Sequence, residues 1–330
     1  MVMDLSVQLM QATVQLEQPL GDGTRTVGTG FLISEMTPDG KTHTILVTAN
    51  HVFDKMPKTD ARIGYRVANP DGSWSYSPQL LKIRDAHGHA LWTHHPSRDV
   101  AAISITAPAA FAQAAIPEDY LAADDTFAKY QVGAGDEMMA LGFPRGLAAN
   151  AAGFPILRAG KVASYPIAPA KMFPTFLLDF AVFPGNSGGP VFMSGPARRN
   201  TGEPGQPRQD VEFIAGLLTQ QVELNSERLD IGIVTNAKYI RETLDLIRDP
   251  TAPVTEVASQ SVISGAKAAS ADPAQPRQDV EFIAGLLTQQ VELNSERLDI
   301  GRLRSNVDVN AADVDQVWVL QGATKGARHF

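Results

Sequence analysis

The chain has no cysteine in its 330 residues. Disulfide bonds, thiolate zinc sites and cysteine nucleophiles are therefore excluded. It also lacks an apolar run near the roughly 18 residues that span a bilayer. The first residues, MVMDLSVQLMQATVQLEQPLGDG, have neither the basic segment nor the uninterrupted apolar core of a signal peptide. We expect no membrane span and a cytoplasmic protein; an exported or periplasmic location is the alternative if a leader has been removed.

Positive charge is scarce as well, with 28 Lys and Arg against 36 Asp and Glu and a net charge of -8. Nucleic-acid-binding proteins usually carry a basic face or stripe, so a nucleic-acid partner is not expected. No motif in the chain implies a cofactor. The length suits one large domain or two modest ones with a substantial core.

Short strand-like segments separated by turn-forming residues fill the first 235 residues. So many short strands with almost no helix between them favour an all-β sandwich or barrel over a parallel sheet. A helix is predicted at Ala237–Arg248, where apolar residues recur at helical spacing before Pro250. The predicted strands are Leu5–Leu16, Thr26–Ser34, His43–Thr48, Ala61–Val67, Gln79–Ile83, Ala101–Ile105, Glu137–Leu141, Ile156–Ala163, Thr175–Phe180, Pro190–Met193, Glu212–Thr219 and Leu229–Val234.

One segment of the chain occurs twice. QPRQDVEFIAGLLTQQVELNSERLDIG occupies residues 206–232 and returns unchanged at 275–301. Two copies are too few for a solenoid, which needs three or more stacked units. The Ala-, Ser- and Pro-rich residues 250–274 predict a linker, and residues 302–330 a tail. Only the first copy runs into the predicted helix, so we expect it alone to complete the fold; a homo-oligomer formed by exchange of the second copy is the alternative.

The stretch FPGNSGGPVF at residues 183–192 places three glycines around Ser187. Glycine is used where the backbone needs a positive φ or where another group approaches it closely. A serine hydroxyl becomes a nucleophile when a base lies within hydrogen-bond reach and a third group orients that base. Of the seven histidines, His51 follows an apolar strand in THTILVTANHVF, and Asp99 directly precedes one in SRDVAAISI. These three residues are the candidate nucleophile, base and orienting acid.

Five motifs, in this order along the chain, resemble those of the trypsin-like serine peptidases, and especially cysteine-free bacterial members similar to the high-temperature-requirement proteases. The motifs are GTGFLIS at 28–34, TANHV at 48–52, DVAAI at 99–103, LGFPRG at 141–146 and GNSGGPV at 185–191. The resemblance implies a peptidase domain over residues 1–249. It would contain two packed antiparallel six-stranded β-barrels, about 5–115 and about 125–236, followed by the helix at 237–248.

The resemblance also implies roles for individual residues in the hydrolysis of peptide bonds in protein or peptide substrates. Ser187 attacks the scissile carbonyl and forms an acyl-enzyme, while His51 takes its proton and later returns it to the leaving amine. Asp99 fixes the imidazole tautomer and stabilises the imidazolium. The backbone N–H groups of Gly185 and Ser187 form the oxyanion hole.

By the same resemblance, Ala181, six residues before Ser187, lies at the floor of the main specificity pocket. The wall comes from Ile214–Thr219, of which Leu217 and Thr219 are the candidate lining residues. No acid faces the pocket in this register, so we expect small or medium apolar substrate side chains rather than Lys or Arg. Asp179 is two residues away, and a shift of that size would reverse the expectation.

Three other interpretations remain to be weighed. GNSGG also fits the nucleophile elbow of α/β-hydrolases, which needs a helix directly after the serine and a histidine later in the chain. Pro190 disfavours that helix. The only later histidine is His329, next to last in the tail, so both requirements weigh against the elbow. A metal site could use the histidines of HGHALWTHHP, but no two of them lie at the i, i+4 spacing of a zinc helix, so none is expected. Those histidines are His87, His89, His94 and His95.

The third alternative is a non-catalytic peptide-binding or scaffold protein on a protease fold. The presence of His51, Asp99, Ser187 and Gly185 weighs against it. The residues after 250 do not resemble the peptide-binding domain of the high-temperature-requirement proteases. The regulation and trimeric assembly that accompany that domain are therefore not carried over to this chain.

Overall fold

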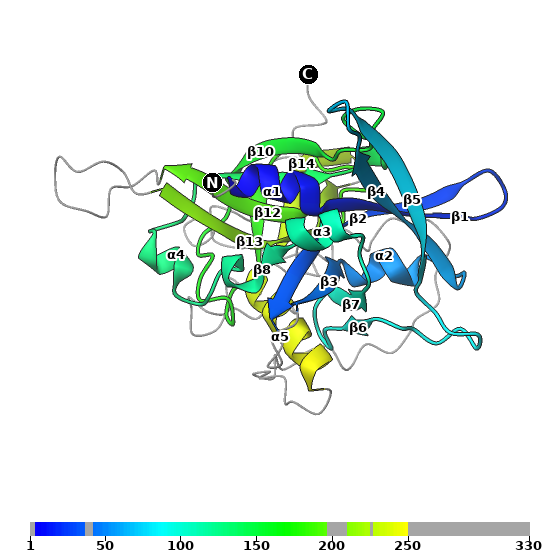
Figure 1. Cartoon of the computed structure of the whole chain (residues 1–330). Helices are drawn as coiled ribbons and strands as arrows, with labels where there is room; N and C mark the ends of the chain where they lie inside the picture. The colour runs from blue at the N-terminus through cyan, green and yellow to red at the C-terminus, as the bar shows by residue number, and fades with distance from the viewer. Residues whose placement is uncertain (1–3, 37–41, 197–209, 225–226, 250–330) are drawn as a thin grey trace, which may run out of the picture. The chain divides into compact units, whose positions relative to one another are not determined.

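The computed structural model describes residues 4–36, 42–196, 210–224 and 227–249 (Figure 1). The predicted linker 250–274, the second copy at 275–301 and the tail 302–330 lie outside the described residues. The first copy of the repeated segment, at 206–232, supplies one whole described strand, Asp210–Leu224, and the first part of a second, Glu227–Asn236.

The first half of the described chain is an antiparallel sheet with the strand order β5-β4-β1-β2-β3-β7-β6, and β8 pairs with β2 in parallel. Three short helices, α1 (Leu5–Ala12), α2 (Asn50–Asp54) and α3 (Ala109–Ala114), accompany it. The strands are β1 (Thr13–Pro19), β2 (Arg25–Met36), β3 (Thr42–Thr48), β4 (Asp60–Ala68), β5 (Trp74–Lys82), β6 (Thr93–His94), β7 (Ala101–Ile105) and β8 (Ile116–Pro117).

The second half closes into a six-stranded barrel with the order β10-β11-β14-β13-β12-β9. Three single-turn helices, η1 (Glu118–Tyr120), α4 (Thr126–Lys129) and η2 (Pro144–Gly146), lie in its connections. The barrel strands are β9 (Glu137–Gly142), β10 (Ile156–Val162), β11 (Thr175–Asp179), β12 (Pro190–Pro196), β13 (Asp210–Leu224) and β14 (Glu227–Asn236). The all-β fold class predicted from the sequence is confirmed, with one closed six-stranded barrel and an eight-stranded sheet in the other half, consistent with a chymotrypsin-like double barrel.

The segment Leu5–Leu16 was expected to be one strand, and this prediction is wrong for its first eight residues, which form α1. Asp4 caps this helix, because its side chain accepts a hydrogen bond of 2.8 Å from the Ser6 N–H. Leu5, Leu9 and Ala12 are buried on one face of the helix. Spacing of i, i+4 therefore decides the structure here, and the strand begins only at Thr13.

The predicted helix at Ala237–Arg248 is confirmed as α5. Asn236 caps it, since its side chain accepts a hydrogen bond of 3.0 Å from the Lys238 N–H. The helix leaves the barrel at β14 and packs against β13 on one side and β6 and β7 on the other. Near its start it therefore connects the barrel with the part of the first sheet that carries Asp99 (Figure 1).

A buried arginine, Arg66 of β4, also joins the two halves. Its guanidinium donates to the Gly153 carbonyl at 2.9 Å in the second half and to the Gln11 carbonyl at 2.6 Å in α1. The group lies 5.0 Å from the ring centroid of Phe111 and 4.8 Å from that of Phe154. Burial lowers the pKa of Arg66 to about 10, so the side chain is still charged at neutral pH.

Candidate active site

The candidate base and its orienting acid form a close pair. His51 lies in the first turn of α2, directly after β3, rather than in the strand-end loop expected from the sequence. Its Nδ1 is 2.6 Å from Oδ2 of Asp99, and its backbone N–H donates to the other carboxylate oxygen at 2.9 Å. A carboxylate accepts only, so Nδ1 carries the proton and Nε2 is left free to accept one. The two side chains are 27% and 28% exposed, so the pair is partly open to solvent.

The loop around Ser187 requires its glycines. Gly185 has φ of 98° and Gly188 has φ of 87°, a region that side chains rarely adopt. A Cβ on Gly185 would lie 2.3 Å from the Phe143 carbonyl oxygen, and one on Gly188 would lie 2.1 Å from that of Thr29. The chain then enters strand β12 at Pro190. A strand in place of a helix after the serine excludes the α/β-hydrolase elbow.

Thr29 of β2 attaches this loop to the first sheet. Its N–H donates to the Ser187 carbonyl at 2.9 Å, and its hydroxyl donates to the Gly185 carbonyl at 2.7 Å. The Thr29 carbonyl in turn accepts the Thr48 hydroxyl at 2.7 Å, three residues before His51. Thr29 is fully buried. Although it lies in the GTGFLIS motif, its role was not predicted, because its partner Gly185 lies 156 positions further along the chain.

The Ser187 hydroxyl itself donates to the Thr219 carbonyl of β13 at 3.2 Å. Within the described residues it makes no hydrogen bond to His51. The backbone N–H groups of Gly185 and Ser187 also donate to no acceptor in the described part of the chain. The described fold therefore uses neither of these two N–H groups as a donor.

The three candidate pocket residues lie in different settings. Thr219 contacts the nucleophile through its carbonyl, as described above. Ala181 is half-buried, and its carbonyl accepts a hydrogen bond of 2.7 Å from Arg158 Nη1. Leu217 is fully buried and lies opposite Pro190 in the β12–β13 pair. Its side chain therefore belongs to the barrel core.

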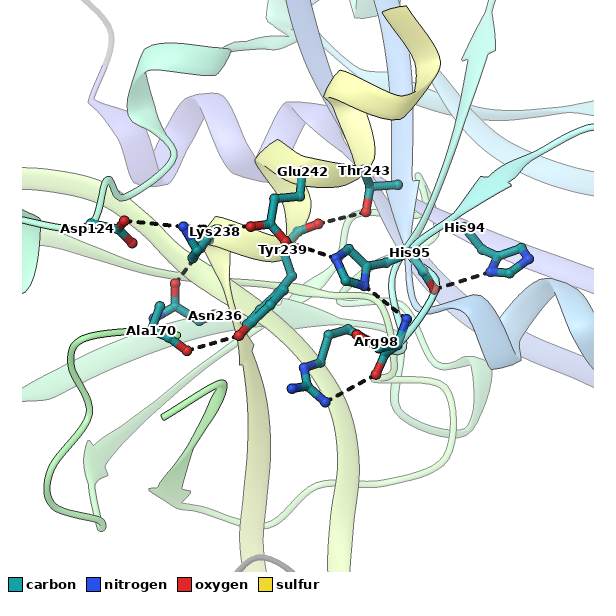
Figure 2. A network of polar contacts seen from close by, with 11 residues as sticks. His94, His95, Arg98, Asp124, Ala170, Asn236, Lys238, Tyr239, Glu242 and Thr243 are labelled. Carbon is teal, nitrogen blue, oxygen red and sulfur yellow. Dashed lines mark hydrogen bonds and ion pairs between the residues drawn. The ribbon is translucent and has the colours of Figure 1, made fainter. Parts of the chain in front are cut away.

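The loop that carries Asp99 is attached to α5 through His95 (Figure 2). The imidazole of His95 is fully buried, and its Nδ1 accepts the Ser97 N–H at 3.2 Å. Nε2 must then carry the ring proton, which it donates to Oε2 of Glu242 at 2.9 Å. The His95 ring also meets the edge of the Tyr239 ring at a centroid distance of 5.3 Å. The loop before Asp99 is thus held by a hydrogen bond and a ring contact to one helix.

Lys238 completes the network on the other side of Glu242. Its Nζ lies 3.2 Å from Asp124 and 3.6 Å from Glu242. Burial lowers the pKa of Lys238, but the hydrogen bonds and charges of the two carboxylates outweigh it and raise the pKa above its ordinary value. Lys238 is therefore charged at neutral pH and compensates the carboxylate that holds His95.

The remaining histidines of HGHALWTHHP do not form a metal site. In the described ranges, no group of three or more His, Asp or Glu side chains is placed to hold a metal ion. His89 instead pairs with Asp85 at 2.9 Å, and His95 with Glu242 as described.

None of the helices in the described ranges has the length and apolar character needed to cross a bilayer.

The fold and site define a class. A β-sheet half that provides a His–Asp pair and a barrel half that provides a serine between glycines are the components of a chymotrypsin-like double barrel. A family comparison agrees: residues 28–195 match the model of the trypsin-like peptidase domain, about half of the chain. The chain belongs to this family.

Solved structures give a more distant likeness. The HtrA-type protease AlgW with a tripeptide is 17% identical with a TM-score of 0.46, over 74% of this chain and 63% of that one. Protease Anisep from Arthrobacter nicotinovorans is 15% identical with a TM-score of 0.41, over 71% and 93%. The chain thus spans 63% of the length of the AlgW chain. No curated protein matches it.

Proposed function

We propose that the protein is a serine endopeptidase that hydrolyses peptide bonds through His51, Asp99 and Ser187. The observation that carries the proposal is the two-point contact between Asp99 and His51. It fixes both the position of the imidazole and its tautomer, which leaves Nε2 as the acceptor that a general base needs. The family membership of the chain supports the same activity.

In the proposed reaction, the Ser187 hydroxyl turns from the Thr219 carbonyl towards His51 Nε2. Its oxygen then attacks the substrate carbonyl carbon while its proton passes to Nε2, and Asp99 stabilises the resulting imidazolium. Collapse of the tetrahedral intermediate breaks the C–N bond, and the leaving amine receives the proton from Nε2. Water repeats the two steps on the acyl-enzyme and regenerates the hydroxyl.

The negative oxygen of each tetrahedral intermediate would be bound by the N–H groups of Gly185 and Ser187. Both are without a protein acceptor among the described residues, and the positive φ of Gly185 belongs to the same turn. Preorganised donors of this kind need no rearrangement as charge develops. Loss of one such donor typically costs about 100- to 1,000-fold in rate.

One observation favours a second candidate, a peptide-binding protein on this fold. The Ser187 hydroxyl is bonded to Thr219 and not to His51. A serine kept in this position would leave the cleft able to bind a peptide without cleaving it. Catalytic hydrogen bonds are often incomplete before substrate binds, so we favour the peptidase.

A peptide-library digest tests the two candidates. The purified protein is expected to cleave a subset of peptides, and Ser187→Ala is expected to lose at least about 1,000-fold of that rate. Ser104→Ala, at an exposed serine of β7, is the matched control and should cleave as the wild type does. Cleavage that survives Ser187→Ala would contradict the proposed nucleophile. Binding of peptides without any cleavage would favour the second candidate.

A further inference from the structure

Three arginines from three separate elements surround one aromatic ring beside the candidate active site. The guanidinium carbons of Arg145 (η2), Arg158 (β10) and Arg228 (β14) lie 5.6, 5.2 and 5.1 Å from the ring centroid of Phe183. Guanidinium groups at this distance are attracted to the ring face. We refer to these four residues as the arginine cluster.

The arginine cluster lies against the segment that leads to Ser187. Phe183 is four residues before the serine, and its carbonyl accepts the Asn186 N–H at 3.0 Å. The backbone N–H of Arg145 donates to the Pro184 carbonyl at 2.6 Å, directly before Gly185. A Cβ built on Gly185 would lie only 3.2 Å from the same nitrogen. The cluster is therefore next to the candidate oxyanion hole.

Arg158 fixes the cluster on its other side. Its Nη1 donates to the carbonyl of Ala181, the residue expected at the floor of the specificity pocket. Arg145 is exposed, while Arg158 and Phe183 are half-buried. The three guanidinium groups thus gather at the side chain of Phe183, which lies between Ala181 and Gly185 in the chain, and Arg145 is exposed to solvent.

The charges of Arg145 and Arg158 are not paired with acids in the described part of the chain. This is unusual in a chain whose net charge is -8. The N–H groups of a guanidinium match the geometry of a carboxylate and can donate two parallel hydrogen bonds to it.

We propose that the arginine cluster binds a carboxylate side chain of the substrate, so that the enzyme prefers peptides with Glu or Asp close to the scissile bond. This inference rests on the proposed peptidase function and names its substrate class. From Ala181 alone, small or medium apolar substrate side chains were expected. The three arginines come from distant parts of the chain, and they favour an acidic side chain instead.

The test uses paired peptides that differ only by Glu or Gln at each position from four before to four after the cleaved bond. Wild type should cleave one Glu peptide about tenfold faster than its Gln partner, as kcat/KM, because a charge-assisted hydrogen bond is worth about a factor of ten or more. The preference should decrease in high salt.

Arg145→Gln is the first variant, since its side chain is exposed and makes no hydrogen bond to the described residues. It should reduce the Glu-to-Gln ratio, with little effect on the Gln peptide. Arg158→Lys and Arg158→Gln form a second pair, in which the lysine should retain more of the preference. Arg62→Gln, at an exposed arginine of β4, is the matched control and should leave the ratio unchanged.

Binding of the same peptides to Ser187→Ala separates this proposal from the proposed function. Tighter binding of the Glu peptide, lost in the double variant with Arg145→Gln, supports the arginine cluster even if the wild type cleaves nothing; in that case only the peptidase proposal fails. Equal binding and equal cleavage of the Glu and Gln peptides at every position would overturn the carboxylate site.

Discussion

Removal of the Glu242 carboxylate tests whether α5 positions Asp99. In Glu242→Ala, the fully buried His95 loses the acceptor of its Nε2 proton. An unsatisfied buried donor costs about 1–3 kcal/mol, which is less than the stability of a typical domain, so the variant is expected to stay folded. The loop between His95 and Asp99 loses one of its attachments to α5.

The expected kinetic effect follows from the geometry. Asp99 holds His51 at two points, so a shift of the loop moves the imidazole relative to Ser187. A misplacement of about 1 Å can cost up to 100-fold in rate, and we expect about tenfold in kcat for this partial release. KM should change little, because Glu242 contacts His95 and Lys238 and bonds to none of the candidate pocket residues in the described part of the chain.

The assay is steady-state cleavage of one good peptide, with thermal unfolding measured in parallel. Glu242→Gln keeps an oxygen acceptor for His95 and should retain most of kcat. Asp124→Ala serves as the control, because it removes only a partner of Lys238. The Asp124 side chain is 62% exposed, so its removal leaves His95 bound to Glu242. If Glu242→Ala unfolds at a lower temperature but keeps the wild-type kcat, the contact is structural only and the positioning argument is refuted.

Three further perturbations have defined outcomes. Gly185→Ala should lower kcat by about 100-fold or more, because its Cβ would meet the Phe143 carbonyl at 2.3 Å and displace an oxyanion donor; unchanged kcat would contradict the assignment. Arg66→Met should destabilise the protein by about 3 kcal/mol in thermal unfolding, since it leaves buried carbonyls without a donor. Deletion of residues 250–330 should leave the unfolding temperature unchanged in thermal unfolding and the oligomeric state unchanged in light scattering, because β13 and β14 lie entirely outside the deleted part. A dimer that is lost on this deletion would instead support exchange of the second copy.

The sequence was informative where the signal is local. Turn residues separated the strands, and the helical spacing before Pro250 predicted α5 with the bounds that the structure has. The five motifs identified His51, Asp99 and Ser187 as candidates, and the structure pairs the first two directly. At Leu5–Ala12, the cap and the helical spacing act over only eight residues, and the strand prediction for this segment was wrong.

Other features depend on contacts between distant residues, and these could not be predicted from one sequence. His95 and Glu242 are 147 positions apart, and only the packing of α5 on β6 and β7 brings them together. The arginine cluster likewise draws on η2, β10 and β14. The bond between Ser187 and Thr219 is a side-chain conformation that no sequence pattern specifies.

The most direct test of the proposed function is labelling by a fluorophosphonate, which reacts with a serine only when a neighbouring base activates it. We expect one label per chain, located on Ser187 by mass spectrometry, with none in Ser187→Ala and strongly slowed labelling in His51→Ala. A folded wild-type protein that takes up no label, or takes it up at another serine, would contradict the assignment of His51, Asp99 and Ser187 as the catalytic residues.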